Sequence, residues 1–264
     1  MYTVMNKPLV ITTFRSGSTV LTEMLATIAV EYLGFKKYLD EPFTMMGYGS
    51  QHHAKTFGSY KNSDGEDILY TSNYSAFDKS NATAESRYKE RLRRLDLLKN
   101  NPHTYMFKVM ADITLPPEVV EWCSNERSPI FLERRDRMAQ LVSWCSYLQH
   151  PPHYTKSSQQ RLKYTINHIN YNRDMCLYFI KSHIHAYDEW KKKYSSAPVI
   201  YFEDIIDSNP SKKLCSLMGV EDNITIEPKY LPVPYAKNNR EDLIRSPGWK
   251  QDRAMLEQLI YSEM

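Results

Sequence analysis

Cysteine and glycine are both scarce in this chain of 264 residues. The four cysteines are widely spaced and form no CxxC pair, which excludes the usual zinc-ligand patterns and a disulfide framework. We expect them to be buried as small apolar side chains. Only 8 glycines accompany 20 tyrosines, so a glycine in a tight turn is more informative here than usual.

Long apolar runs and strong charge are absent as well. No stretch approaches 18 uninterrupted apolar residues, so no membrane span is predicted. Residues 1–4 lead directly into a strand-like segment without room for a signal peptide, and we therefore expect a cytoplasmic protein.

The net charge of +3 suits an anionic small molecule better than nucleic acid. The basic residues 87–94 carry leucines at helical spacing and are interpreted as the solvated face of an amphipathic helix.

Strand-like and helical segments alternate along the chain. Short runs rich in apolar and β-branched residues predict strands, and apolar residues at a period of 3.6 predict helices. This alternation favours an α/β fold with a mostly parallel central sheet flanked by helices. We expect a single domain over residues 1–264 with a polar insertion at about 43–103, and residues 221–264 are not placed. The predicted strands are residues 8–14, 105–110, 129–133 and 198–202, and the predicted helices are residues 18–33, 136–148, 159–194 and 210–218.

The turn after the first strand reads Phe-Arg-Ser-Gly-Ser-Thr. A helix that starts at the carboxyl end of a parallel strand presents backbone N–H groups that bind phosphate or sulfate. Gly17 permits close approach of the backbone, Ser16, Ser18 and Thr19 carry hydroxyl donors, and Arg15 is a permanent cation. The Walker A glycine and lysine are missing. Two interpretations remain, an anion-binding turn or an ordinary βα turn capped by Ser18.

A second candidate anion site begins at the predicted strand over residues 129–133. The following helix starts with Arg134, Arg135 and Asp136, and Ser143 lies eight residues after Arg135. Arginines at a helix start oppose the helix dipole. We interpret this unfavourable arrangement as a sign that a bound anion compensates the charge, and hence as a second phosphate site.

Together the two segments resemble the nucleotide-binding motifs of the PAPS-dependent sulfotransferases, in which PAPS is 3′-phosphoadenosine 5′-phosphosulfate. The closest resemblance is to the bacterial trehalose sulfotransferase-like branch, whose loop reads Arg-Ser-Gly-Ser and whose second motif is Arg-Arg-Asp with a following Gln and Val-Ser. The resemblance implies a P-loop-like sulfotransferase fold. It also implies transfer of a sulfuryl group from PAPS to a hydroxyl or amine of a carbohydrate or other small metabolite, with PAP as product and no metal.

The resemblance also assigns roles. Arg15 stabilises the leaving-group oxygens, although cytosolic members carry lysine there and arginine cannot donate the proton. The turn from Ser16 to Thr19 holds the 5′-phosphate, and Arg135 with Ser143 holds the 3′-phosphate. Glu41, in a segment similar to one that carries a catalytic glutamate, is the candidate base. Lys108 either contacts the transferred sulfuryl group or reaches solvent as a strand lysine.

Several alternatives stay open. His52 and His53 rival Glu41 as the base because the pKa of histidine suits proton transfer. The polar residues 43–80 form the pocket for a small-molecule or glycan acceptor, or a lid over it. The main alternative function is a P-loop-type nucleotide kinase or NTPase, and a non-enzymatic alternative is a PAP-binding module without catalysis.

Overall fold

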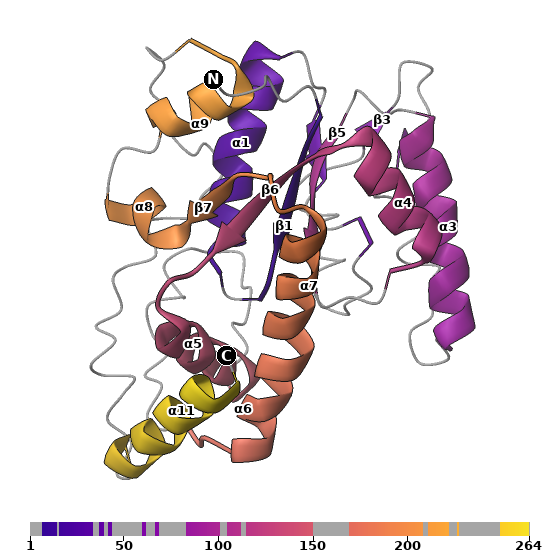
Figure 1. Ribbon diagram of the computed structural model, residues 1–264. Coiled ribbons are helices and arrows are strands. Elements are labelled where there is room, and N and C mark those ends of the chain that lie inside the picture. The colour runs from indigo at the N-terminus through magenta and orange to yellow at the C-terminus, as the bar shows by residue number, and fades with distance from the viewer. Residues whose placement is uncertain are drawn as a thin grey trace.

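The computed structural model describes residues 7–14, 16–33, 37–39, 42–43, 60–61, 67–68, 83–100, 105–111, 115–149, 169–207, 211–221, 226 and 249–263. Within these residues five parallel strands form one sheet in the order β2-β5-β1-β6-β7 (Figure 1). The α/β fold with a mostly parallel sheet is therefore confirmed. The strands are β1 (Pro8–Thr12), β2 (Lys37–Leu39), β5 (Tyr105–Met110), β6 (Ser128–Glu133) and β7 (Val199–Tyr201), and a separate antiparallel pair joins β3 (Tyr60–Lys61) to β4 (Asp67–Ile68).

Helices cover both faces of the sheet, and every residue of the central strand β1 is therefore buried. Leu9 and Ile11 pack in one apolar cluster with helices α3, α4 and α7, whereas Val10 packs in another with α1, α8 and α9. Figure 1 shows α1 and α9 on one side of the strands and α3 and α4 on the other. The bounds are α1 (Ser18–Tyr32), α3 (Ala84–Lys99), α4 (Pro117–Glu126), α7 (His185–Lys193), α8 (Phe202–Asp207) and α9 (Ser211–Met218).

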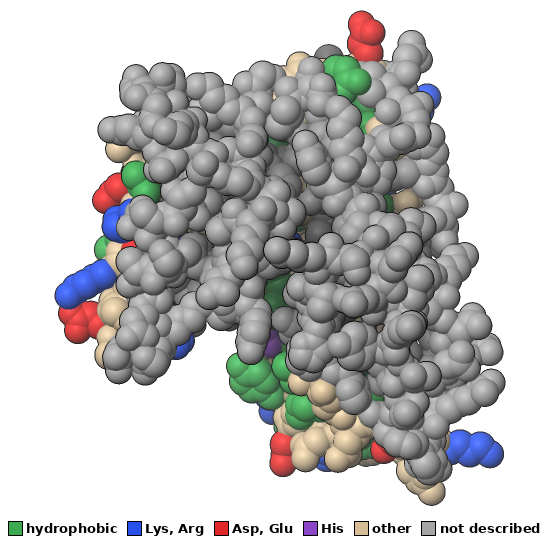
Figure 2. Space-filling view, turned by 180° about the vertical axis from the view of Figure 1, so that it is seen from behind, with side chains coloured by type: hydrophobic (Ala, Val, Ile, Leu, Met, Phe, Trp, Pro, Cys, Tyr) green, Lys and Arg blue, Asp and Glu red, His purple; other side chains and the backbone are tan. Residues whose placement is uncertain are grey.

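A third apolar cluster lies beyond the carboxyl ends of the strands, at the bottom of Figure 1. It joins α5 (Arg137–Gln149), α6 (Arg173–Phe179), the π-helical turn η2 (Ile180–Ile184) and α11 (Trp249–Glu263). The helix predicted over residues 159–194 is described from Arg173 onward, where the Asn172 side chain accepts hydrogen bonds from two backbone N–H groups. Hydrophobic side chains reach the surface at this end of the molecule (Figure 2). Leu148 and Tyr178 are both exposed.

The basic segment 87–94 lies within α3, so its helical prediction is confirmed. Its interpretation as a solvated face is wrong for Arg94, whose side chain is only 1% exposed. The Arg94 guanidinium lies 2.9 Å from the carboxylate of Glu90 and donates to the backbone oxygen of Pro42 at 2.6 Å. A buried arginine needs such acceptors because removing its charge from water is costly.

All four cysteines are buried, as predicted, and are free thiols. The sulfur atoms of Cys145 in α5 and Cys176 in α6 lie 3.8 Å apart.

Among the residues that the structure describes, none of the helices is both long and apolar enough to span a membrane. The same residues contain no cluster of three or more His, Cys, Asp or Glu side chains that could hold a metal ion.

Candidate functional site

The connections that leave the carboxyl ends of β1 and β6 run to opposite sides of the sheet. After β1 it runs through α1 to β2 on one side, and after β6 it runs to β7 on the other side. Ligands of open α/β sheets bind in the crevice at such a switch point. Because β1 and β6 are hydrogen-bonded neighbours, the two turns selected from the sequence meet at this place in the fold.

The turn after β1 is shaped by Gly17, which precedes α1 with a φ of 85° in the left-handed region. A Cβ atom at this position would stand 2.0 Å from a ring carbon of Phe202. Glycine is therefore required for two reasons. The backbone is left-handed here, and the ring of Phe202, the first residue of α8, occupies the space that a side chain would need. Arg15 lies outside the described residues, and for Thr19 the structure describes the backbone in α1 alone.

Hydroxyl groups inside the turn bind the turn itself. The Ser16 hydroxyl is hydrogen-bonded to that of Thr12 and donates to the backbone oxygen of Thr13 at 2.8 Å. Ser16 is 1% exposed, so its side chain stabilises the turn in this structure. Ser18, at the first position of α1, is also buried. The backbone N–H groups that open α1 remain the natural anion donors.

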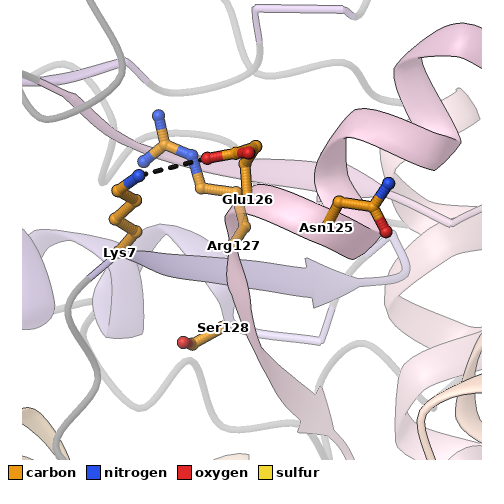
Figure 3. Close-up of a pocket in the computed structure, with 5 residues that line it drawn as sticks. All are labelled: Lys7, Asn125, Glu126, Arg127 and Ser128. Carbon is orange, nitrogen blue, oxygen red and sulfur yellow. Dashed lines mark hydrogen bonds and ion pairs between the residues drawn. The ribbon is translucent and has the colours of Figure 1, made fainter.

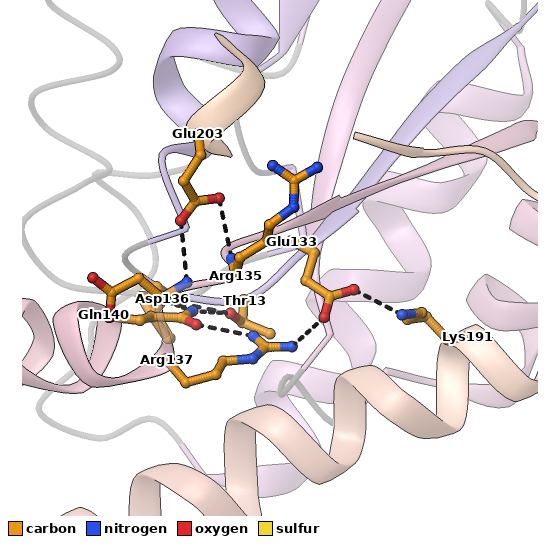
Figure 4. A network of polar contacts seen from close by, with 9 residues as sticks. Thr13, Glu133, Arg135, Asp136, Arg137, Gln140, Lys191 and Glu203 are labelled. Carbon is orange, nitrogen blue, oxygen red and sulfur yellow. Dashed lines mark hydrogen bonds and ion pairs between the residues drawn. The ribbon is translucent and has the colours of Figure 1, made fainter. Parts of the chain in front are cut away.

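Gln140 of α5 connects the second motif to the first, as Figure 4 shows. Its side chain is completely buried. The Nε2 atom donates to the hydroxyl of Thr13 at 2.6 Å and to the backbone oxygen of Phe14 at 2.8 Å. The sequence resemblance included Gln140 but gave it no role. The sequence signal that could have indicated one is its position about one turn into the helix that follows the predicted strand over residues 129–133.

The network extends from Gln140 to the neighbouring strand and helix. The Gln140 Oε1 atom accepts a hydrogen bond from Arg137 at 2.9 Å, and Arg137 donates to Glu133 at 2.7 Å. The second oxygen of Glu133 accepts from Lys191 of α7, also at 2.7 Å (Figure 4). Since Arg137 and Glu133 are 14% and 16% exposed, this ion pair is shielded from solvent more than a surface pair.

Arg135 is engaged by acidic residues from the start of α8. Its side chain is 51% exposed, and its Nη1 atom lies 2.6 Å from the Asp204 carboxylate. The guanidinium also stacks over the ring of Tyr201, 3.9 Å from the ring centre. The backbone N–H groups of Arg135 and Asp136 donate to the two carboxylate oxygens of Glu203 at 3.1 and 3.2 Å.

The basic start of α5 is therefore compensated within the chain. Glu203 accepts from backbone N–H groups, and Asp204 neutralises the arginine charge. Internal compensation does not test anion binding, so the second phosphate site stays a prediction. Asp136 caps α5, because its carboxylate accepts from the N–H of Ala139 at 2.7 Å.

Both acidic side chains have a lowered pKa. Partial burial raises the pKa of Glu203, but hydrogen bonds from backbone N–H groups, including that of Arg135, together outweigh burial and lower it. A hydrogen bond from Arg135 is the main cause that lowers the pKa of Asp204, with a second from Lys213. Both carboxylates are consequently ionised at neutral pH.

The remaining predicted residues are distributed as follows. Lys108 lies in β5 beside Val10 of β1 and is 2% exposed, so its interpretation as a lysine that reaches solvent is wrong. Ser143 is half-buried in α5. Glu41, His52 and His53 lie outside the described residues. Next to Glu41, the backbone oxygens of residues 42 and 43 accept hydrogen bonds from two arginines of α3.

A separate hollow of about 210 Å³ lies at the amino ends of β1 and β6 (Figure 3). Its lining includes the ion pair of Lys7 with Glu126, 3.2 Å apart. This is the opposite edge of the sheet from the two turns. None of the site residues predicted from the sequence lines it.

No family model matches the chain, and no curated protein matches it. The functional assignment therefore depends on the two motifs and on the geometry that joins them at the switch point.

Proposed function

We propose that this chain is a PAPS-dependent sulfotransferase that acts on a small-molecule or glycan acceptor in the cytoplasm. The observation that supports it most is the contact between the two motifs. Gln140, which belongs to the segment that resembles a 3′-phosphate motif, donates to Thr13 and Phe14 of the segment that resembles a 5′-phosphosulfate loop. Motifs for the two ends of one nucleotide are expected to be neighbours.

The 5′-phosphosulfate binds at the start of α1 in this proposal. The left-handed Gly17 ends the turn immediately before the helix, where free N–H groups and the positive end of the dipole favour an anion. Arg15 adds a permanent positive charge that stabilises the developing charge on the leaving oxygen. Sulfuryl transfer, like phosphoryl transfer, depends on positioning and charge stabilisation rather than on covalent chemistry by the protein.

The chemical step is an in-line displacement at sulfur. The acceptor oxygen forms a new bond to sulfur while the bond between sulfur and the bridging oxygen of the 5′-phosphate breaks. The electron pair of that bond leaves with PAP. Glu41 takes the acceptor proton, because a hydroxyl nucleophile needs a base within hydrogen-bond reach. Lys108 is the proposed cation for the transferred group.

The 3′-phosphate binds to Arg135 and Ser143. In the structure Arg135 is paired with Asp204, but the arginine is half exposed and the carboxylate 31% exposed. Such exposed pairs contribute little to stability because water screens them. A phosphate dianion, which offers more negative charge and bidentate geometry, therefore displaces Asp204 at low cost.

Transfer of labelled sulfate from PAPS to a panel of sugars, lipids and phenols tests the activity. We expect product with at least one hydroxyl acceptor, and Glu41→Ala should abolish transfer while PAP binding is retained. Full activity of Glu41→Ala would move the base to His52 or His53. Tight PAP binding without transfer to any acceptor would favour a PAP-binding module, and phosphoryl transfer from ATP would favour a nucleotide kinase.

A further inference from the structure

Gln140 fixes the backbone of the turn after β1 from one side. Its Nε2 group donates to the Phe14 carbonyl and to the Thr13 hydroxyl. From the other side the Ser16 hydroxyl donates to the Thr13 carbonyl. The Phe14 ring contacts the ring of His183 edge to face, with 5.1 Å between centroids. Two successive residues just before the predicted anion site are thus fixed in both backbone and side chain.

The orientation of the Gln140 amide is determined by Arg137. A guanidinium can only donate hydrogen bonds, so the atom that faces it must be the amide oxygen. The amide NH₂ group then necessarily points to the turn, where the Phe14 carbonyl can only accept. Glu133 holds Arg137 in turn, and Lys191 of α7 holds Glu133. The position of the turn therefore depends on a chain of contacts that reaches α7.

We infer that Gln140 is a positioning residue that holds the turn between β1 and α1 in its anion-binding conformation and so determines affinity for the 5′-phosphate. This inference rests on the proposed function. A preorganised turn presents its N–H groups without an ordering cost at binding. Gln140 acts through Thr13 and Phe14, and no contact of its own with the nucleotide is required.

Variants that keep the volume of the side chain test this role. Gln140→Met removes all three hydrogen bonds, whereas Gln140→Glu keeps an acceptor for Arg137 but cannot donate to the Phe14 carbonyl. Gln149→Met is the matched control, because Gln149 lies in the same helix and also makes hydrogen bonds to backbone, in its case to the N–H and carbonyl of Asn170.

Affinities for PAP and for adenosine 5′-monophosphate are measured by titration calorimetry. Both Gln140 variants should weaken both nucleotides about tenfold, which corresponds to about 1.4 kcal/mol. The ratio of the two affinities should stay unchanged, since that ratio reports Arg135 and Ser143. Gln149→Met should bind both nucleotides like the wild type.

Unchanged affinity in Gln140→Met would overturn the inference. So would a fall in the affinity ratio, because that would mean a general disturbance of α5 including Arg135. If the wild type binds neither nucleotide, the proposed function fails, and backbone hydrogen exchange of residues 13–17 still decides the positioning role. Faster exchange in Gln140→Met than in the wild type and Gln149→Met supports it, and equal exchange contradicts it.

Discussion

The guanidinium of Arg135 and the carboxylate of Asp204 form an ion pair of 2.6 Å between residues 69 positions apart. The pair joins α8 to the turn between β6 and α5, where the second phosphate site is predicted. Asp204 therefore competes with any anion for this arginine, and the competition has measurable consequences.

Neutralising Asp204 should strengthen binding of a 3′-phosphate. We expect Asp204→Asn to lower the dissociation constant of PAP about two- to fivefold, the range that corresponds to an exposed ion pair. Affinity for adenosine 5′-monophosphate should not change. Asp96→Asn, on the exposed face of α3, changes the net charge equally and is the control. Weaker PAP binding by Asp204→Asn would mean that Asp204 orients Arg135 for the ligand instead.

Acid should weaken the attachment of α8 to α5. The folded pKa values of Glu203 and Asp204 are lowered, so in acid the unfolded chain binds more protons than the folded protein. The stability that the ionised Glu203 and Asp204 side chains contribute to the folded protein is fully present above the unfolded pKa values, about 4.3 for glutamate and about 3.9 for aspartate. It is lost as the pH falls through the folded pKa values.

Urea unfolding at a series of pH values measures this dependence. The double variant Glu203→Gln/Asp204→Asn should have a flatter decline of unfolding free energy below about pH 4 than the wild type. Parallel curves for the two proteins would show that these carboxylates do not contribute to the acid dependence.

A side chain at position 17 should be poorly tolerated. Gly17→Ala places a Cβ atom against the Phe202 ring and forces alanine into a left-handed conformation. We expect a loss of about 2–4 kcal/mol in unfolding free energy. Gly219→Ala shares the positive φ and should lose about 1–2 kcal/mol from the backbone conformation.

The double variant Gly17→Ala/Phe202→Ala separates the two causes. Removal of the ring should make the added methyl group at position 17 less costly than it is in the wild-type background. If the cost of Gly17→Ala is the same in both backgrounds, the ring is not what excludes a side chain there.

Arg94 should support both stability and the position of Glu41. Arg94→Met removes the donor to the Pro42 carbonyl and leaves the Glu90 carboxylate with less compensation, so we expect a loss of about 3 kcal/mol. Because Pro42 directly follows Glu41, kcat for sulfate transfer should fall while PAP affinity is retained.

Arg93→Met is the matched control for Arg94. Arg93 bonds the same Glu90 carboxylate, but its side chain is 39% exposed, and its loss should cost less than about 1 kcal/mol. Equal losses for the two variants in denaturant unfolding would contradict the importance of burial at position 94.

Local patterns predicted the elements around the site well. The strand over residues 105–110 agrees with β5, and the helix over residues 18–33 differs from α1 by its last residue. Strand alternation, helical periodicity and a turn with glycine are all properties of a few consecutive residues. Sequence patterns did not predict the helices α4, α8 and α11 or the short strands β2, β3 and β4. Helix α8 is too short to give a clear periodic signal.

Long-range partners account for what the sequence could not predict. Glu203 and Asp204 follow the predicted strand over residues 198–202 in the sequence. The contact of Asp204 with Arg135 depends on β7 lying beside β6. Burial of Arg94 similarly depends on a carbonyl 52 positions earlier in the chain. No spacing within one helix encodes such pairs, because the sheet order that creates them is a property of the whole fold.

The most direct test of the account is the nucleotide preference of the wild-type protein and of Arg135→Ala. At 100 times its dissociation constant PAP should stabilise the wild type by about 2.7 kcal/mol, measured by thermal shift and calorimetry. Adenosine 5′-monophosphate should bind more weakly, and Arg135→Ala should lose that preference. Stabilisation by ATP with none by PAP would contradict the account.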